Sequence, residues 1–244
     1  MRLRLIRFIL GALILAPSLP VHAQAPKFDS ATVARANKPI LRTGELIGVL
    51  ATTGVALALD QTLRNTIYDP HDRFGRSVSD LGNAMGNGLY IYPSLLALAV
   101  AGKAFGSPGL YGVSSRALKS GLLAGAGAVV LKSLIGRERP AADNAYQFHP
   151  FTLSDERSSF PSGHTTLAFA VATSFSREIG GHWDDVAFYS LATVTAYARM
   201  HDNRHWMSDV VFGAGVGILS ARFIHRREAK LLLGKNVVGA SLTF

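Results

Sequence analysis

The sequence of 244 residues contains no cysteine, and this absence excludes a disulfide scaffold, a cysteine-based zinc site and a thiol nucleophile. It is also poor in charge, because charged residues make up 17% of the chain and hydrophobic residues 48%. An intrinsically disordered chain has the opposite balance. The sequence therefore predicts a compact globular domain or a membrane-embedded one, and its length fits one domain with a short tail.

Acidic residues are the scarcer of the two charged classes. The chain has 25 Lys and Arg against 16 Asp and Glu, which gives a net charge of +9. Such a balance favours an anionic partner, whether nucleic acid, anionic lipid or a phosphorylated substrate. Composition does not choose among these three, so the choice must come from motifs.

The N-terminal segment has the pattern of a secretory signal peptide. Three arginines are followed by an apolar stretch and then by small residues at the positions that signal peptidase recognises. An uncleaved membrane anchor is the alternative, but the apolar stretch is short for a full span and contains Pro17 and Pro20. We therefore expect residues 1–23 to be removed and residues 24–244 to form an exported periplasmic domain, either soluble or membrane-associated.

Strict two-residue alternation, the pattern of half-buried strands, is almost absent. The chain instead shows six weakly charged runs rich in Ala, Leu and Val, separated by polar connections that contain Gly or Pro. These runs predict an all-α bundle of six helices, at residues 46–59, 89–102, 120–131, 165–175, 186–198 and 210–221. The best strand candidate is residues 237–244, which could equally be a tail lying over the bundle.

The lengths of these runs bear on whether the helices lie in lipid. Each run is about 11 to 15 residues long, shorter than the roughly 17 to 25 residues of a membrane span. Flanking residues could extend some of them, notably residues 81–102, which lack charge but include Asn83 and Asn87. Run length therefore favours a soluble or peripherally bound bundle, with a multi-pass membrane protein as the alternative.

Three polar clusters interrupt the apolar pattern. The first places Lys132 at the end of an apolar run and Arg139 directly before Pro140, which discourages further helix. On its own this cluster has an ordinary explanation, because cations near a helix C-terminus balance the helix dipole and the free carbonyls.

The second cluster, Pro161-Ser162-Gly163-His164, opens an apolar helix. Ser162 could simply cap that helix. However, a helix N-terminus at which Gly163 lets a ligand approach the backbone is also an anion site. His164 could then donate a proton to the group that leaves the anion. Ser162 is not expected to be a nucleophile, because no Gly-x-Ser-x-Gly elbow surrounds it.

The third cluster runs from Arg199 to Asp209 between two apolar runs. If residues 205–209 are helical, His205 and Asp209 lie four apart on one face. Asp209 could then accept the Nδ1 proton of His205 and leave Nε2 free as a base or nucleophile.

Two other interpretations of the third cluster remain open. His201, His205 and Asp209 could form a metal-binding face, although the arginines beside them create a cationic setting that disfavours a metal. The cluster could also be a solvated loop between helices, in which Ser208 caps the last helix.

Taken together, the three clusters resemble the three-part signature of the type 2 phosphatidic acid phosphatase and vanadium haloperoxidase superfamily. The order and the spacings both match: Lys132-x6-Arg139-Pro140, then Pro161-Ser162-Gly163-His164, then Arg199-x5-His205-x3-Asp209. Each cluster has an ordinary explanation by itself, but the three in this order do not. The resemblance, with the helix count, covers most of residues 24–244, although only the layout matches before residue 110.

Two positions depart from the family pattern. Ala198 stands where the family usually has a serine, so a hydroxyl contact to the phosphate or its neighbours is missing. Asn203 stands where a glycine is frequent, and asparagine tolerates a left-handed backbone better than most other residues. We expect weakened contacts and a working site.

The resemblance implies a phosphatase that needs neither a metal ion nor a cofactor. A phosphate monoester resists attack because its charged oxygens repel nucleophiles, so the enzyme must neutralise them and hold the reacting groups in line. In the family pattern this is the role of three cations, one hydroxyl and one backbone amide: Lys132, Arg139, Arg199, Ser162 and Gly163.

The same resemblance implies the roles of two histidines and an aspartate. His205 attacks phosphorus to form a phosphohistidine, and Asp209 orients and supports the resulting imidazolium. His164 protonates the departing alkoxide and later activates water. The implied reaction is a two-step hydrolysis through a covalent intermediate.

The substrate remains open at this point. Export, a basic chain and an apolar helical body suit a lipid-linked phosphate. Candidates are phosphatidic acid, phosphatidylglycerol phosphate, an isoprenyl diphosphate and a lipid A phosphate. We expect a membrane surface as a possible further partner, and no nucleic acid. They also suit a broad-specificity phosphatase acting on small soluble esters. A vanadate-dependent haloperoxidase would share the site, but those enzymes look much longer. A phosphate-binding protein would not need both His164 and His205.

Overall fold

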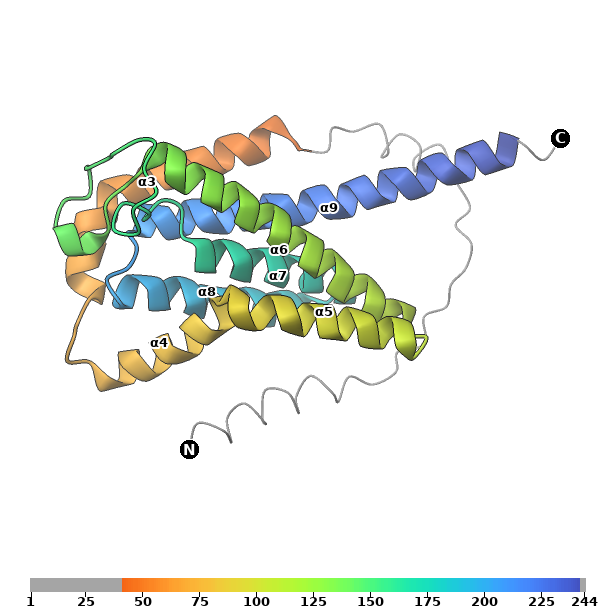
Figure 1. Ribbon diagram of the computed structural model, residues 1–244, viewed down its shortest axis with the longest axis horizontal. Coiled ribbons are helices and arrows are strands. Elements are labelled where there is room, and N and C mark those ends of the chain that lie inside the picture. The colour runs from red at the N-terminus through yellow and green to blue at the C-terminus, as the bar shows by residue number, and fades with distance from the viewer. Residues whose placement is uncertain (1–40, 242–244) are drawn as a thin grey trace.

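The computed structural model describes residues 41–241, so the signal peptide expected in residues 1–23 lies outside the described part of the chain. This part folds into seven α-helices, one short 3-10 helix and no strand, with a single isolated bridge between Arg137 and Phe148 (Figure 1). The elements are α3 (Thr43–Ile67), α4 (Arg73–Gly86), α5 (Gly88–Ala104), α6 (Pro108–Ile135), η1 (Pro140–Ala142), α7 (Gly163–Ile179), α8 (His182–His201) and α9 (Met207–Ser241).

The predicted all-α class is confirmed, and each of the six predicted runs lies inside a helix. The count of six is wrong for the described residues, because α4 was missed. This helix buries small residues, Gly75, Ser79, Gly82 and Gly86, and so shows no apolar run in the sequence. The strand considered for residues 237–244 does not form at residues 237–241, where α9 continues to Ser241, and the last three residues lie outside the described part of the chain.

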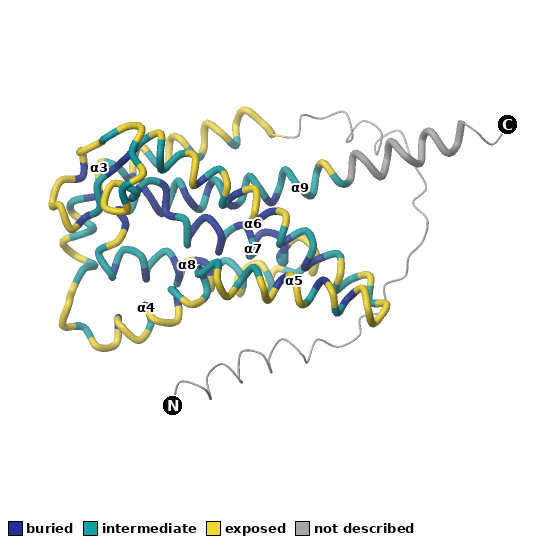
Figure 2. The backbone as a smooth tube through the Cα atoms, in the orientation of Figure 1, coloured by how far each residue is buried: buried dark blue, intermediate teal, exposed yellow. Residues whose placement is uncertain are grey.

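Helix α7 lies in the middle of the bundle and packs against α6, α8 and α9 (Figure 2). Its buried positions are mostly small residues, including Thr165, Thr166, Ala168 and Ala170. Small side chains let neighbouring helices approach closely, and the burial of their surface stabilises the bundle. The first turn of α7, which holds the second cluster, is thereby fixed at the centre of one end of the molecule.

The helices are much longer than their apolar runs. Helix α3 has 25 residues and α6 has 28, and both are apolar and long enough to cross a membrane, as is the segment Met207–Glu228 of α9. Helices α4 and α5, bent by 50° at their junction, would add a fourth span if counted as one. The sequence analysis favoured a water-soluble bundle because it took each helix to be as short as its apolar run. That premise was wrong, since Gly, Ser, Thr and a few polar residues extend each run without ending the helix.

The outer faces of these long helices carry exposed apolar residues. On α3 and α6 they include Leu50, Val55, Leu122, Val129 and Val130, each more than half exposed. Large contiguous apolar patches are rare on water-soluble monomers. This surface is suited to contact with lipid.

Candidate active site

All three polar clusters meet at one end of the bundle, where α6 ends, α7 begins, α8 ends and α9 begins (Figure 1). Helix α6 stops at Gly136, whose φ of 60° is left-handed. A side chain there would clash with the His149 carbonyl, since a Cβ would lie 1.8 Å from that oxygen. Glycine at this position therefore lets the chain leave α6 and fold back over the end of the bundle.

Ser158 connects the two cations of the first cluster. Lys132 donates from Nζ to the carbonyl of Ser158, and Arg139 donates from Nη2 to the Ser158 hydroxyl at 3.2 Å. Lys132 also lies over the start of α7, because a Cβ on Gly163 would be 3.8 Å from its Cε. The first and second clusters are therefore adjacent, as the spacing motif predicts.

Arg139 also reaches the third cluster and the surface. Its Nη1 donates to the carbonyl of Arg204 at 3.5 Å, and its Nη2 lies 2.8 Å from the Asp155 carboxylate. The side chain of Asp155 is 81% exposed. The ion pair is therefore accessible to solvent, where exchange for an incoming anion costs little.

Arg199, in the last turn of α8, is held by α4. Its Nη1 donates to Oδ1 of Asn83 at 2.5 Å, and Asn83 in turn donates from Nδ2 to Asp202 at 2.6 Å. The buried Nε of Arg199 has no hydrogen-bond partner among the described residues. Burial, with the positive charge of Arg139 nearby, lowers the pKa of Arg199 to about 10, so the guanidinium stays charged at neutral pH.

The pKa of His164 is lowered by all three cations. Its pKa is lowered to about 4, first by burial and then by the positive charges of Arg199, Lys132 and Arg139. Two of these cations belong to the first cluster and one to the third, and charges act on an imidazole in this way only from nearby, so both clusters lie near His164. His164 is consequently neutral at physiological pH while no anion occupies the site.

His205 lies just before α9, and its ring is anchored by the backbone. Nδ1 donates to the carbonyl of Ser159 at 2.7 Å, whereas the Oδ2 of Asp209 is 3.6 Å away. The predicted direct bond to Asp209 is therefore corrected: Asp209 lies beside the imidazole, but a carbonyl is the closer acceptor. Burial, reinforced by Lys132, lowers the pKa of His205 to about 3. With the proton on Nδ1, the lone pair remains on Nε2.

Asp209 is held by a buried network that the sequence analysis missed. Arg137 donates from Nη1 to Asp209 and from Nη2 to Asp60, each at 2.6 Å, and all three side chains are fully buried. Ser159 also donates to Asp209, and Ser208 donates to Asp60 at 2.6 Å. The only sign of this network in the sequence was Asp60, a charged residue directly after the apolar run 46–59.

Ser162 and Gly163 form the start of α7. The Ser162 hydroxyl lies 3.0 Å from Oγ1 of Thr165, and its backbone amide donates to the carbonyl of Asp209 at 3.1 Å. Ser162 thus ties the second cluster to the third. The first-turn amides of Gly163 and His164 have no partner within the helix, as at any helix start, and so remain donors for an anion.

The alternative metal face does not form. His201 turns toward α4, with Nε2 3.9 Å from Asp72 and Nδ1 3.5 Å from Asp202. His205 points instead to Ser159. Among the described residues, no group of three or more His, Asp or Glu side chains is placed to hold a metal ion.

The two departures from the family pattern have different structural settings. Ala198 is completely buried against α4, where a Cβ on Gly82 would lie 2.7 Å from its own Cβ. Asn203 has a φ of 55°, and its Oδ1 accepts a hydrogen bond from Arg64 at 3.1 Å. The left-handed backbone expected at Asn203 is therefore confirmed.

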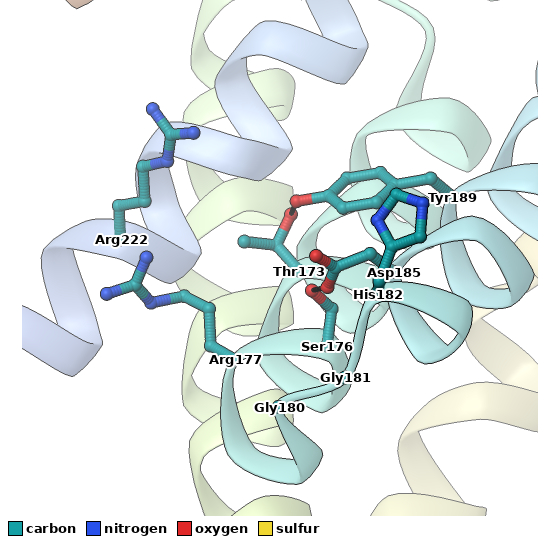
Figure 3. Close-up of a pocket in the computed structure, with 9 residues that line it drawn as sticks. All are labelled: Thr173, Ser176, Arg177, Gly180, Gly181, His182, Asp185, Tyr189 and Arg222. Carbon is teal, nitrogen blue, oxygen red and sulfur yellow. Dashed lines mark hydrogen bonds between the residues drawn. The ribbon is translucent and has the colours of Figure 1, made fainter.

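A cavity of about 660 Å³ lies elsewhere in the described part of the chain (Figure 3). It is at the opposite end of α7, with Arg177 and Arg222 on one side and Tyr189 and Asp185 on the other. Arg222 is paired with Glu45, and Asp185 accepts from Ser176. None of the residues in the three clusters lines this cavity.

The fold and the site together define a helical bundle with a cation-lined pair of histidines at one end. The sequence matches the PAP2 superfamily over residues 116–232, a range that contains all three clusters. This match is to the superfamily that the three clusters resemble.

Two relatives illustrate the likeness. The chain is 54% identical over 63 residues to a lipid A 1-phosphatase of Porphyromonas gingivalis, an alignment that covers 25% of this chain and 14% of the relative. It also resembles the crystal structure of Aquifex aeolicus LpxE, with a TM-score of 0.54 and 22% identity over 70% of this chain and 95% of that one. The second likeness concerns the fold.

Proposed function

We propose that the chain is a metal-independent phosphatase that removes phosphate groups from lipid-linked substrates through a phosphohistidine intermediate. The observation that carries this proposal is the convergence of Lys132, Arg139 and Arg199 around His164, beside a His205 ring whose Nε2 is unprotonated. A site that only bound phosphate would need the cations but neither imidazole.

In the first step, the three cations and the first amides of α7 bind the phosphoryl oxygens and offset their negative charge. The Nε2 lone pair of His205 attacks phosphorus, and the bond to the leaving oxygen breaks. His164 gives its proton to that oxygen, so the alcohol leaves neutral. The phosphoryl group is then bonded to Nε2.

The protonation of His164 follows from the charge of the substrate. In the free site the cations and burial keep this imidazole neutral. A bound phosphate dianion offsets the cations and raises the pKa of His164, so the imidazole takes up a proton where it is needed. In the second step His164, neutral again, removes a proton from water, which attacks phosphorus and releases inorganic phosphate and His205.

The rest of the third cluster supports His205. Its Nδ1 proton is held by the Ser159 carbonyl, which fixes the ring orientation. The Asp209 carboxylate, 3.6 Å from Nδ1, stabilises the positive charge that develops when Nε2 becomes bonded to phosphorus. Asp209 is thus proposed to act electrostatically and not as a base.

A lipid-linked substrate is supported by two observations. The aligned relative is a lipid A 1-phosphatase, and three helices of this chain are long and apolar enough to span a membrane. We propose that residues 1–23 direct export and that the protein then acts at the periplasmic face of a membrane. If mass spectrometry of the purified protein shows an N-terminus directly after residue 23, this result would support the export step.

The test is phosphate release by purified protein in detergent from a lipid panel and from soluble p-nitrophenyl phosphate. We expect turnover of lipid A 1-phosphate, phosphatidic acid or an isoprenyl diphosphate, unchanged by excess chelator and inhibited by vanadate. Turnover of soluble esters alone would overturn the lipid assignment. Halide oxidation with vanadate and peroxide would identify a haloperoxidase.

The intermediate can be trapped separately. Rapid quenching with a ³²P-labelled substrate should leave label on His205, stable to alkali and labile to acid. Loss of activity in chelator, or absence of label during steady turnover, would contradict the proposed mechanism.

A further inference from the structure

The connection between α6 and α7 carries two large apolar residues at its surface. Phe151 is 84% exposed and Leu153 is 93% exposed, the highest value among the exposed large apolar residues of the described chain. We call these two residues the apolar tip. Isolated apolar residues are common on protein surfaces, so exposure alone does not assign the tip a role.

The tip is held in place by hydrogen bonds to the end of α6. His149 donates its amide to the Gly136 carbonyl at 2.8 Å, and Thr152 donates its amide to the Ser133 carbonyl at 3.1 Å. These two bonds bracket Phe151. The backbone thus presents the tip outward from a fixed position, at the C-terminal end of a helix long enough to span a membrane.

Phe151 has a strained backbone. Its φ of 63° lies in the left-handed region, where a bulky residue is a genuine outlier. Such strain persists where the surrounding structure imposes it, often at functional positions. In Phe151 this strain accompanies an exposed phenyl ring, so burial within the chain does not compensate for it.

The surroundings of the tip match a lipid interface. The end of α6 beside it is apolar and exposed at Val129, Val130 and Leu134, so the tip continues the apolar surface of that helix. Beyond Leu153 the connection turns polar: Asp155 is 81% exposed at its side chain, and Arg157, 45% exposed, lies 3.8 Å from Glu138. An apolar group at the end of a candidate membrane span, followed by charged residues, suits the boundary between acyl chains and headgroups.

The tip also lies close to the candidate site. Asp155 is bonded to Arg139, and Ser158 to both Lys132 and Arg139, so two to seven residues separate the tip from groups that contact the proposed phosphate cations. A lipid headgroup in contact with the tip would therefore lie close to the phosphate site.

We propose that Phe151 and Leu153 insert into the headgroup and acyl boundary of the lipid layer and position the membrane surface, with its phosphorylated lipid, at the site. This proposal rests on the proposed lipid phosphatase function. The occupant is a phospholipid layer, not a second protein, because the tip adjoins the apolar end of a candidate membrane span.

The first test compares two substrates. The double variant Phe151→Asn, Leu153→Ser keeps a residue that tolerates positive φ and changes only exposed side chains. We expect kcat/KM for lipid phosphate in vesicles to fall at least tenfold through KM, while kcat/KM for p-nitrophenyl phosphate stays within twofold. The matched control is Trp183→Ser, which removes an 80% exposed aromatic residue at the other end of the bundle; it should change neither value.

The outcomes separate this proposal from the proposed function. If the wild-type protein hydrolyses neither substrate, the phosphatase assignment fails. If the wild type hydrolyses lipid phosphate and the double variant does so equally well, the tip has no role in lipid access and the inference is overturned. Equal losses on both substrates would also overturn it, because they would indicate a structural role.

The second test does not use activity. Since the chain has no cysteine, Leu153→Cys provides a unique site for an environment-sensitive fluorophore. In vesicles of phosphatidylethanolamine and phosphatidylglycerol we expect a blue-shifted emission that is quenched by lipids brominated near the headgroup. Glu156→Cys, an exposed polar position in the same connection, serves as the control. Emission from position 153 equal to that from position 156, without quenching, would contradict insertion.

Discussion

Arg137 donates a hydrogen bond from Nη1 to Oδ1 of Asp209 at 2.6 Å, and neither side chain has any exposure to solvent. The same guanidinium binds Asp60 on α3, so one cation is shared by two buried carboxylates. The candidate catalytic aspartate is therefore fixed by residues from α3 and from the connection after α6. His205 depends on this network, because the Asp209 carboxylate lies 3.6 Å from its ring.

Removal of Arg137 should destabilise the protein and impair the site. Arg137→Met leaves Asp60 and Asp209 buried without a counter-charge, and breaking a buried ion pair in this way costs about 3–5 kcal/mol. We expect a lower Tm in detergent and a kcat at least tenfold lower in the fraction that folds. Arg157→Met, an exposed arginine of the same connection, is the matched control. Similar Tm values for the two variants would show that the buried network does not stabilise the fold.

The two histidines should respond differently to the leaving group. His205→Ala should abolish turnover of every substrate, since it removes the proposed nucleophile. His164→Gln should lower kcat/KM for alkyl phosphates at least 100-fold, in line with the loss of a general acid. It should lower kcat/KM for p-nitrophenyl phosphate less than tenfold, because p-nitrophenolate leaves without a proton. Equal losses on both esters would argue against His164 as the acid.

The sequence was sufficient to predict the apolar helices and the meeting of the three clusters. The apolar runs correspond to helices because they must be buried or placed in lipid. The cationic residues of the first and third clusters lie near His164, as their family spacing implies. The lengths of the helices could not be predicted from the apolar runs, since polar and small residues continue a helix without an apolar signal.

The missed features depend on contacts between distant segments. Helix α4 escaped detection because Gly82 and its small neighbours bury no large side chain, and their role is to let α8 approach. Arg137 pairs with Asp60, 77 residues away, which no local pattern records. The acceptor of the His205 ring is the carbonyl of Ser159, and any residue type would supply the same atom.

The pKa of His164 should depend on occupancy of the site. Burial and three cations lower this pKa to about 4, so the imidazole is neutral above that pH in the free protein. Vanadate carries negative charge that offsets the cations and should raise the pKa toward or above its ordinary value of about 6.5. The measurement is an NMR titration of the imidazole, assigned by difference from His164→Gln. An unshifted pKa in the free protein, or no change with vanadate, would contradict the proposed charge arrangement.

Asn83 should act as a positioning residue for Arg199. Its carbonyl oxygen accepts from Arg199 and its amide donates to Asp202, so the loss of the side chain frees the guanidinium. A hydrogen bond to a charged group contributes about 1.5–3 kcal/mol, and we expect Asn83→Ala to weaken vanadate inhibition about tenfold or more. Asn65→Ala, an exposed asparagine on α3, is the control. The pKa of His205 and the Tm of the variant should change little. Unchanged values would distinguish a loss of positioning from a loss of folding.

Asn203 should be replaceable by glycine but not by a β-branched residue. Its φ of 55° sets the turn after α8, in which the amides of Arg204 and His205 both donate to the Arg199 carbonyl at 3.1 Å. Asn203→Gly keeps this backbone and loses only the bond to Arg64, so kcat/KM should stay within about threefold. Asn203→Val places a stiff side chain at positive φ, at a cost of about 1–3 kcal/mol, and should lower both Tm and kcat/KM. Equal activity of the two variants would mean that this turn does not position His205.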